Sequence, residues 1–295
     1  MTAMTSRSRG IGTYLSFVKF EHTLFALPFA YIGMLLAADG WPGWRALVLV
    51  TLAMVGARTC AMAANRVIDA RIDALNPRTA SREIPSGRLS GRDGVIVAAA
   101  GLALLVVAAA SLNRLTLALL PLAVLFLVAY PYTKRFTWAC HLWLGVTIGA
   151  AAAGGYIAVT GAFDAVAWLL WLAVGAWVAG FDVIYAVLDV EFDRGNGVHS
   201  IPADLGITGA VWATGILFVV SVLALGMAAA AFDVQEREPL AWPFLVAYGA
   251  TAVMLQRQHA RLRTVRDARV LDAFNANMVI GPLMLVGTIL GLALR

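Results

Sequence analysis

Nine long apolar runs constrain the fold of this 295-residue chain more than any other feature. Only 13% of its residues are charged and its mean hydropathy is +0.81, whereas soluble domains carry about 25% charged residues. Each run is close to the ~20 residues that an α-helix needs to cross about 30 Å of hydrocarbon. We therefore expect an all-α integral membrane protein, a single bundle domain over residues 1–295 with about nine transmembrane helices. The expected spans are 23–39, 44–64, 93–111, 115–131, 138–160, 164–188, 208–232, 239–256 and 271–293.

The basic residues are distributed unevenly between the two sets of connecting segments. Lys and Arg gather in the N-terminal segment and in the segments after the second, fourth, sixth and eighth spans. Cytoplasmic loops of membrane proteins carry such an excess, so we expect a cytoplasmic N-terminus and a multi-pass protein of the cell (inner or plasma) membrane. The net charge of +5 is then a topology signal, and we expect membrane lipid and no nucleic acid as partner. The opposite segments hold only Arg45, Arg114, Arg237 and Arg295.

Two polar motifs with the same spacing follow the second and sixth spans. Each places three side chains four residues apart, which puts them on one face of a helix. Two carboxylates one turn apart repel each other, and Mg²⁺ removes this repulsion by binding one or two carboxylates together with substrate phosphates. Solvated loop charges are the simpler interpretation of one motif, but the repetition and the intramembrane Asp182 argue against it. The motifs are Asn65/Asp69/Asp73 and Tyr185/Asp189/Asp193, whose four aspartates are the expected Mg²⁺ ligands.

Basic side chains close to the motifs suit a diphosphate, because guanidinium groups bind phosphate oxygens bidentately. The loop and helix-end candidates are Arg78, Arg82 and Lys134. Some of these charges serve only the topology, so phosphate contact stays open for each of them. Arg58 lies inside the second span, where an unpaired charge is costly. Phosphate contact and an ion pair with Asp182 or Glu21 are the two interpretations of Arg58.

The motifs and their neighbouring segments resemble the UbiA superfamily of membrane prenyltransferases. The family carries NxxxDxxxD after helix two and DxxxD after helix six, and the likeness covers nearly the whole chain. The bacterial 4-hydroxybenzoate polyprenyltransferase subgroup is the most similar branch, although other branches often have Arg where Lys19 stands, which leaves the acceptor open. The segments that carry the resemblance are Asn65–Asp73, Asp182–Asp193, Tyr130–Arg135, Asn76–Gly87 and Lys19–Pro28.

The resemblance implies Mg²⁺-dependent transfer of a polyprenyl group from polyprenyl diphosphate to a small aromatic acid such as 4-hydroxybenzoate. A dihydroxynaphthoate-type acceptor of menaquinone biosynthesis by the futalosine route is the alternative. Asp182 and Arg135 match positions for acceptor binding and activation. The aspartates of both motifs would bind Mg²⁺. The residues expected to bind the diphosphate are Asn65, Arg78, Arg82, Lys134, Arg58, Lys19 and Tyr185.

An allylic cation needs apolar walls that exclude water, and we expect the prenyl tail to leave sideways into lipid. The aromatic candidates for such walls are Phe25, Trp143, Tyr156, Trp171 and Trp177, for each of which ordinary packing is the simpler role. The four histidines do not cluster and receive no role. A cation-coupled transporter is the competing class, but transporter sites usually lie near the bilayer midplane, whereas these motifs lie at the ends of spans.

Overall fold

The computed structural model describes residues 10–19, 23–234, 238–262 and 267–295, which contain helices and no strand. A long helix stands at each of the nine predicted spans: α2 (Thr23–Ala38), α3 (Trp44–Ile68), α5 (Gly91–Leu112), α6 (Arg114–Thr133), α7 (Cys140–Thr160), α8 (Ala165–Ala186), α11 (Gly206–Val234), α12 (Trp242–Leu262) and α13 (Asp267–Ala293). In the described part of the chain, seven helices are long and apolar enough to cross a membrane, namely α3, α5, α6, α7, α8, α11 and α13. The chain is thus a multi-pass membrane protein, and the count of nine spans stays a prediction.

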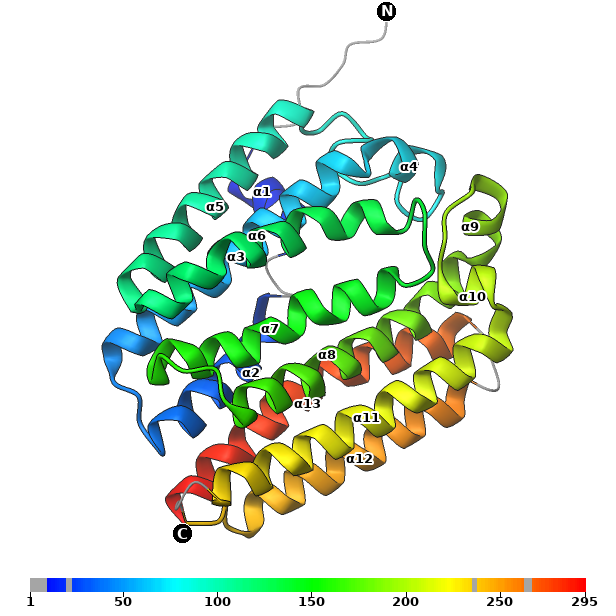
Figure 1. The fold of residues 1–295 in the computed structure, drawn as a ribbon. Coiled ribbons are helices and arrows are strands. Elements are labelled where there is room, and N and C mark those ends of the chain that lie inside the picture. The colour runs from blue at the N-terminus through cyan, green and yellow to red at the C-terminus, as the bar shows by residue number, and fades with distance from the viewer. Residues whose placement is uncertain (1–9, 20–22, 235–237, 263–266) are drawn as a thin grey trace, which may run out of the picture.

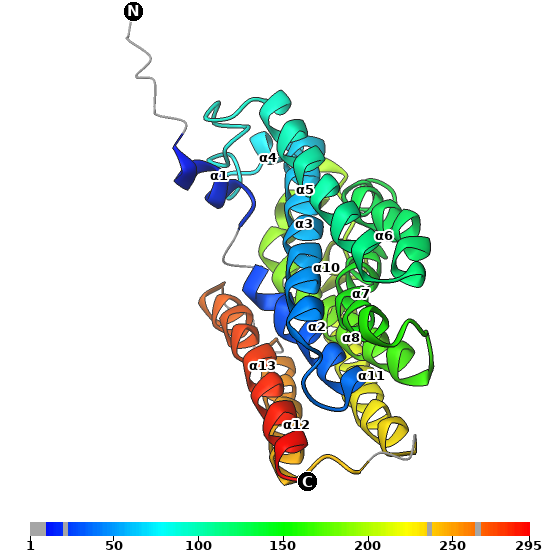
Figure 2. The same ribbon diagram turned by 90° about the vertical axis from the view of Figure 1, so that its left-hand side faces the viewer.

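The long helices pack side by side in one bundle, in pairs that share small residues. The main neighbours are α3 with α5, α7 with α8, α8 with α11, α2 with α7 and α12 with α13 (Figures 1 and 2). At the α2–α7 crossing, a Cβ on Gly155 would lie 2.0 Å from the carbonyl oxygen of Ala30, so only glycine fits there. The adjacent Gly154 has open space around its Cβ position. Of the Gly154–Gly155 pair, Gly155 alone therefore permits the close approach.

Short helices gather at one end of the bundle, opposite the C-terminus (Figure 1). They are α4 (Ala70–Leu75), η2 (Val187–Asp189), α9 (Val190–Asn196) and α10 (Ile201–Asp204). At the N-terminus, α1 (Ile11–Phe17) joins them through Ser16, whose hydroxyl donates to Glu83 Oε1 at 2.8 Å. The distribution of Lys and Arg in the sequence predicts that this end faces the cytoplasm, and the orientation stays a prediction.

Exposed tryptophans mark the opposite end of the bundle. Trp41, in the α2–α3 connection, and Trp44, the first residue of α3, pack edge to face with ring centroids 5.0 Å apart. Trp168, near the start of α8, stacks on Phe163, and Trp242 begins α12. All four tryptophans are more than half exposed. Aromatic side chains of this kind concentrate at membrane–water interfaces, so this end of the bundle has the composition of such an interface.

Both polar motifs cross a break in a helix, which their spacing did not predict. Helix α3 ends at Ile68, and Asp69 adopts φ −91° and ψ 0° before α4 begins. Asp189 takes the similar values φ −107° and ψ 3° between η2 and α9. These values lie in the sparsely populated bridge region, where active-site residues often occur. In the first motif the hydrogen bonds from Asp69 N to Asn65 O and from Asp73 N to Asp69 O are both 2.8 Å, so the predicted helical spacing survives the break.

Candidate active site

The carboxylates of the first motif are buried and paired with cations. Asp69 is 1% exposed and Asp73 4%. Lys134 Nζ lies 2.6 Å from Asp69 Oδ2, and Arg135 Nη2 lies 3.1 Å from Asp69 Oδ1. Arg82 Nη1 lies 2.8 Å from both oxygens of Asp73. The C-terminal end of α6 and the loop after α4 thus bring three predicted cations to this motif.

The loop over residues 76–89 connects the first motif to the second. Arg78 Nε donates to Asp189 Oδ1 at 2.9 Å, and Arg78 Nη1 donates to the Tyr185 hydroxyl at 2.8 Å. Asn76 Nδ2 also donates to Asp189 Oδ1, at 3.0 Å. Burial disfavours the charged guanidinium, but the hydrogen bonds and charge of Asp189 outweigh this, so the pKa of Arg78 is raised. The two motifs, distant in the sequence, therefore form one polar cluster.

Two carboxylates of the second half of the chain contact Ser200 and His141. Asp193 is 7% exposed and its Oδ2 accepts a hydrogen bond from the Ser200 hydroxyl at 3.0 Å. Asp182 Oδ2 lies 2.7 Å from Nδ1 of His141, at the start of α7. The alternative ion pair between Arg58 and Asp182 is therefore wrong, and the other suggested partner, Glu21, lies outside the described residues.

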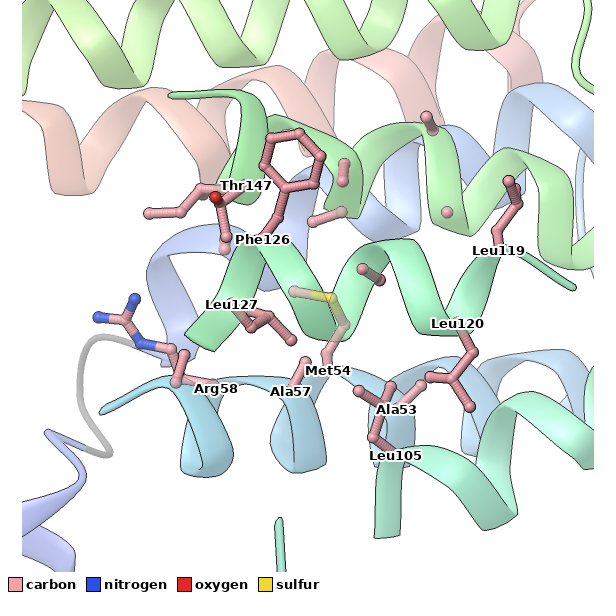
Figure 3. Close-up of a pocket in the computed structure, with 18 of the residues that line it drawn as sticks. Ala53, Met54, Ala57, Arg58, Leu105, Leu119, Leu120, Phe126, Leu127 and Thr147 are labelled. Carbon is pink, nitrogen blue, oxygen red and sulfur yellow. The ribbon is translucent and has the colours of Figure 1, made fainter. Parts of the chain in front are cut away.

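An apolar cavity of about 240 Å³ lies beside the cluster, between α3, α5, α6 and α7, with one residue each from α2 and α8 (Figure 3). Arg58 stands at one end of the cavity and Leu120 toward the other. Its wall is mostly aliphatic, and the side chains of Figure 3 include Ala53, Met54, Ala57, Leu105, Leu119, Phe126, Leu127 and Thr147.

The aromatic residues predicted for the cavity are only partly found there. Trp171 lines it, and Trp143 packs on the lining residue Phe126 with ring centroids 4.7 Å apart. Tyr156 and Trp177 are buried in the main core and are absent from the lining. The side chain of Phe25 lies outside the described part.

The polar end of the cavity is continuous with the first motif. Arg58 and Tyr130 both line the cavity. Asn65 Nδ2 donates to the Tyr130 hydroxyl, so the first residue of the motif is tied to the cavity wall. The Nε atom of Arg58 is inaccessible to solvent and has no hydrogen-bond partner among the described residues. Arg58 is thus placed at the cavity, whereas the cations paired with the motif aspartates are Arg78, Arg82, Lys134 and Arg135.

Three residues lie in positions that their predicted roles did not indicate. Lys19 is exposed after α1 in a left-handed conformation, with φ 49°. Arg135, expected at the acceptor, contacts Asp69, and its guanidinium carbon lies 5.2 Å from the centroid of the Tyr132 ring. His141 was assigned no role although it contacts Asp182. Its position as a histidine inside an apolar run was the signal that could have found it.

The donors at the cluster suit a hard divalent cation. The motif aspartates supply only carboxylate oxygens, which Mg²⁺ prefers. Among the described residues no three acidic, histidine or cysteine side chains gather closely enough to hold an ion by themselves. Because Mg²⁺ usually takes one or two carboxylates and completes its shell with water and substrate phosphate, pairs of aspartates in two motifs fit this ion. The ligands would be Asp69, Asp73, Asp189 and Asp193.

Comparison with known proteins identifies the family of the chain. The model of the UbiA prenyltransferase family matches residues 26–281. A 4-hydroxybenzoate octaprenyltransferase of Nitrosomonas eutropha is 31% identical over 88% of this chain and 88% of its own length. Its counterpart from Acidovorax ebreus is 29% identical over the full length of both proteins.

Solved structures show the same fold. The apo structure of a UbiA homologue from Aeropyrum pernix K1 has a TM-score of 0.82 and 35% identity, covering 91% of this chain and 97% of that one. A UbiA homologue from Archaeoglobus fulgidus bound to DMAPP and Mg²⁺ has a TM-score of 0.73 at 17% identity, covering 96% and 100%, which is a likeness of fold. The chain belongs to the UbiA prenyltransferase family and is a membrane prenyltransferase.

Proposed function

We propose that this prenyltransferase transfers a polyprenyl group from polyprenyl diphosphate to the ring of an aromatic acid of the 4-hydroxybenzoate type, in quinone biosynthesis. The observation that carries the proposal is the position of the acidic and basic cluster at the polar end of an apolar cavity that also exposes Arg58. A diphosphate needs the cluster, a prenyl chain needs apolar walls, and a carboxylate acceptor needs a cation within reach of both. The names of the curated relatives support the same acceptor.

The diphosphate would lie between the two motifs. Arg78, Arg82 and Lys134 are close enough to the motif carboxylates to turn toward phosphate oxygens, and the Tyr185 hydroxyl and Asn65 amide are further donors. Mg²⁺, when bound by the motif aspartates, neutralises negative charge on the leaving diphosphate. As the allylic C–O bond breaks, its electron pair leaves with the diphosphate, and these cations stabilise the developing charge.

The cavity would hold the first part of the prenyl chain. Its volume of about 240 Å³ is below the range of about 300–1,000 Å³ for pockets that enclose a drug-sized ligand. A long polyprenyl chain therefore cannot be enclosed, and we infer that the remainder extends into lipid. The aliphatic wall keeps water away from the allylic carbon, which favours attack by the ring over hydrolysis.

The acceptor would lie at the Arg58 end of the cavity. A guanidinium donates to a carboxylate in a charge-assisted hydrogen bond, and Arg58 Nε has no hydrogen-bond partner within the described part of the chain. The ring carbon ortho to the hydroxyl attacks the allylic carbon, a new C–C bond forms, and the ring loses one proton. Asp182, at the same end of the bundle, is our candidate for the group that accepts this proton.

The motif end of the bundle carries the basic loops, so we propose that the active site faces the cytoplasm, as the excess of Lys and Arg predicts. The fit of the cluster to a diphosphate and membership of a prenyltransferase family favour this function over cation-coupled transport.

The test is a product assay with the protein purified in detergent. It is incubated with farnesyl or geranylgeranyl diphosphate, Mg²⁺ and either 4-hydroxybenzoate or a dihydroxynaphthoate, and the products are identified by mass spectrometry. Prenylated 4-hydroxybenzoate that disappears with EDTA supports the proposal. Product with the naphthoate alone would assign the alternative acceptor. Failure of the folded protein to release diphosphate with either acceptor would refute the proposed reaction.

A further inference from the structure

The carboxylate of Asp182 is held by a buried histidine whose protonation the backbone determines. His141 Nδ1 lies 2.7 Å from Asp182 Oδ2. On its other side, the backbone N–H of Ile201 donates to His141 Nε2 at 3.2 Å. A backbone N–H can only donate, so Nε2 accepts and carries no proton. The single ring proton is then on Nδ1, and the neutral imidazole donates it to Asp182.

The two side chains differ in their access to the site. The His141 side chain is 4% exposed, while that of Asp182 is 28% exposed. The histidine therefore lies behind the carboxylate, and one carboxylate oxygen, Oδ1, is left for another partner. His141 stands on α7 three residues before Leu144, which lines the cavity. The contact with His141 therefore holds Asp182 near the helix that forms one wall of the space in which the acceptor is proposed to bind.

The segment that fixes His141 also contacts Asp193 of the second motif. Ser200 caps α10 by accepting from Ala203 N–H at 3.3 Å, and its hydroxyl donates to Asp193 at 3.0 Å. Ile201, the next residue, fixes His141. One short segment therefore sets the position of two carboxylates, one directly and one through the histidine. Side chains in such supporting contacts fix the orientation of the reacting group, as they do around metal ligands.

We propose that His141 is a positioning residue for the transferase reaction, which holds Asp182 Oδ2 through its Nδ1 proton and directs Oδ1 toward the acceptor. The inference rests on the proposed function, in which Asp182 accepts the ring proton. His141 itself touches neither substrate. A carboxylate held in one rotamer is ready for proton transfer, whereas a freely rotating one is misplaced for part of the time, and a misplacement of about 1 Å can cost about 10²-fold in rate.

Steady-state kinetics of four variants test the role. We expect His141→Ala to lower kcat by about 10²-fold while the KM for prenyl diphosphate stays within about twofold. His141→Asn keeps an N–H donor near the position of Nδ1, so it should recover most of the rate. The double variant His141→Ala/Asp182→Asn should have nearly the same kcat as Asp182→Asn alone, because the effects of residues that act as a unit are not additive. An unchanged kcat in His141→Ala, or an equal loss in the Asp182→Asn background, would overturn the inference.

Nitrogen NMR of the wild-type protein reads the protonation of the ring directly, and a variant serves only to assign the signals. The chain has four histidines, and the His141 signals are those that vanish in His141→Asn. A neutral ring protonated on Nδ1 is the expected result. A ring protonated on Nε2, or on both nitrogens, contradicts the inference even if the enzyme is active. Absence of product from the wild-type protein refutes the proposed function instead, and that result is read from the wild-type product assay alone.

Discussion

Replacing Arg58 with Met tests the proposed acceptor site most directly. The substitution removes the charge at the polar end of the cavity and leaves an unbranched apolar side chain in its wall. The motif aspartates keep their partners Arg78, Arg82 and Lys134, because none of these ion pairs involves Arg58. Binding of prenyl diphosphate should therefore persist, and the loss should concern the acceptor alone.

The size of the effect follows from the kind of interaction that is lost. A hydrogen bond to a charged group contributes about 1.5–3 kcal/mol net. At about 1.4 kcal/mol per factor of ten, kcat/KM for 4-hydroxybenzoate should fall about 10- to 150-fold. The stability of the folded protein, in contrast, should not fall. Arg58 Nε is buried without a hydrogen-bond partner in the described structure, and such a group costs about 1–3 kcal/mol, so the unfolding temperature should stay level or rise.

The assay compares 4-hydroxybenzoate with phenol, which has the same ring and hydroxyl but no carboxylate. Initial rates are measured at saturating prenyl diphosphate for the wild type, for Arg58→Met and for Arg45→Met. Arg45 lies at the other end of α3 and donates to the carbonyl of Ser111, so its replacement is the matched control. We expect the loss in Arg58→Met with 4-hydroxybenzoate only. An equal loss with phenol would refute the role of Arg58 as the carboxylate partner.

Three further substitutions test the cluster and the packing that supports it. Asp69→Asn should lower Mg²⁺-dependent turnover by at least about 10²-fold. The control Asp204→Asn removes only the partly exposed partner of His199 and should leave turnover unchanged. Similar rates in the two variants would contradict a metal role for Asp69. Arg78→Lys keeps the charge but loses the bidentate geometry with which the guanidinium contacts both oxygens of Asp189. The KM for prenyl diphosphate should therefore rise about tenfold, and an unchanged KM would argue against phosphate contact. Gly155→Ala should destabilise the protein by about 1–3 kcal/mol through overpacking, as measured by thermal unfolding in detergent. The control Gly154→Ala places its Cβ in open space and should leave the stability unchanged. Equal unfolding temperatures of the two variants would show that the α2–α7 contact relaxes.

The parts of the fold that depend on local sequence were predictable. Each apolar run is long enough to span a bilayer, so the positions of the nine long helices followed from hydropathy alone. The equal spacing around Asp69 and Asp189 predicted two related acidic sites, and the structure joins them through Arg78. Family resemblance then indicated the reaction class, which the family comparison confirms.

The features that depend on tertiary contacts were not predictable in the same way. Spacing placed Arg58 on the same helix as the first motif, but only the packing of α6 and α7 decides that it meets the cavity. His141 and Asp182 lie in different helices, and the α7–α8 contact brings them together. The helix breaks at Asp69 and Asp189 could not be predicted from the local sequence, because neither position carries Gly or Pro.

Charge balance in the cluster links the metal to the substrate. The cluster has four motif carboxylates, those of Asp69, Asp73, Asp189 and Asp193. It also has four cationic side chains, those of Arg78, Arg82, Lys134 and Arg135, so its net charge is close to zero. Three of the carboxylates are already paired with Lys or Arg side chains. A divalent cation arriving alone must displace these side chains, and a diphosphate arriving alone adds negative charge beside the carboxylates. When both arrive, the cation takes the carboxylates and the freed Lys and Arg side chains take the phosphate oxygens. Each ligand therefore relieves the electrostatic cost of the other, and we expect each to bind more tightly in the presence of the other.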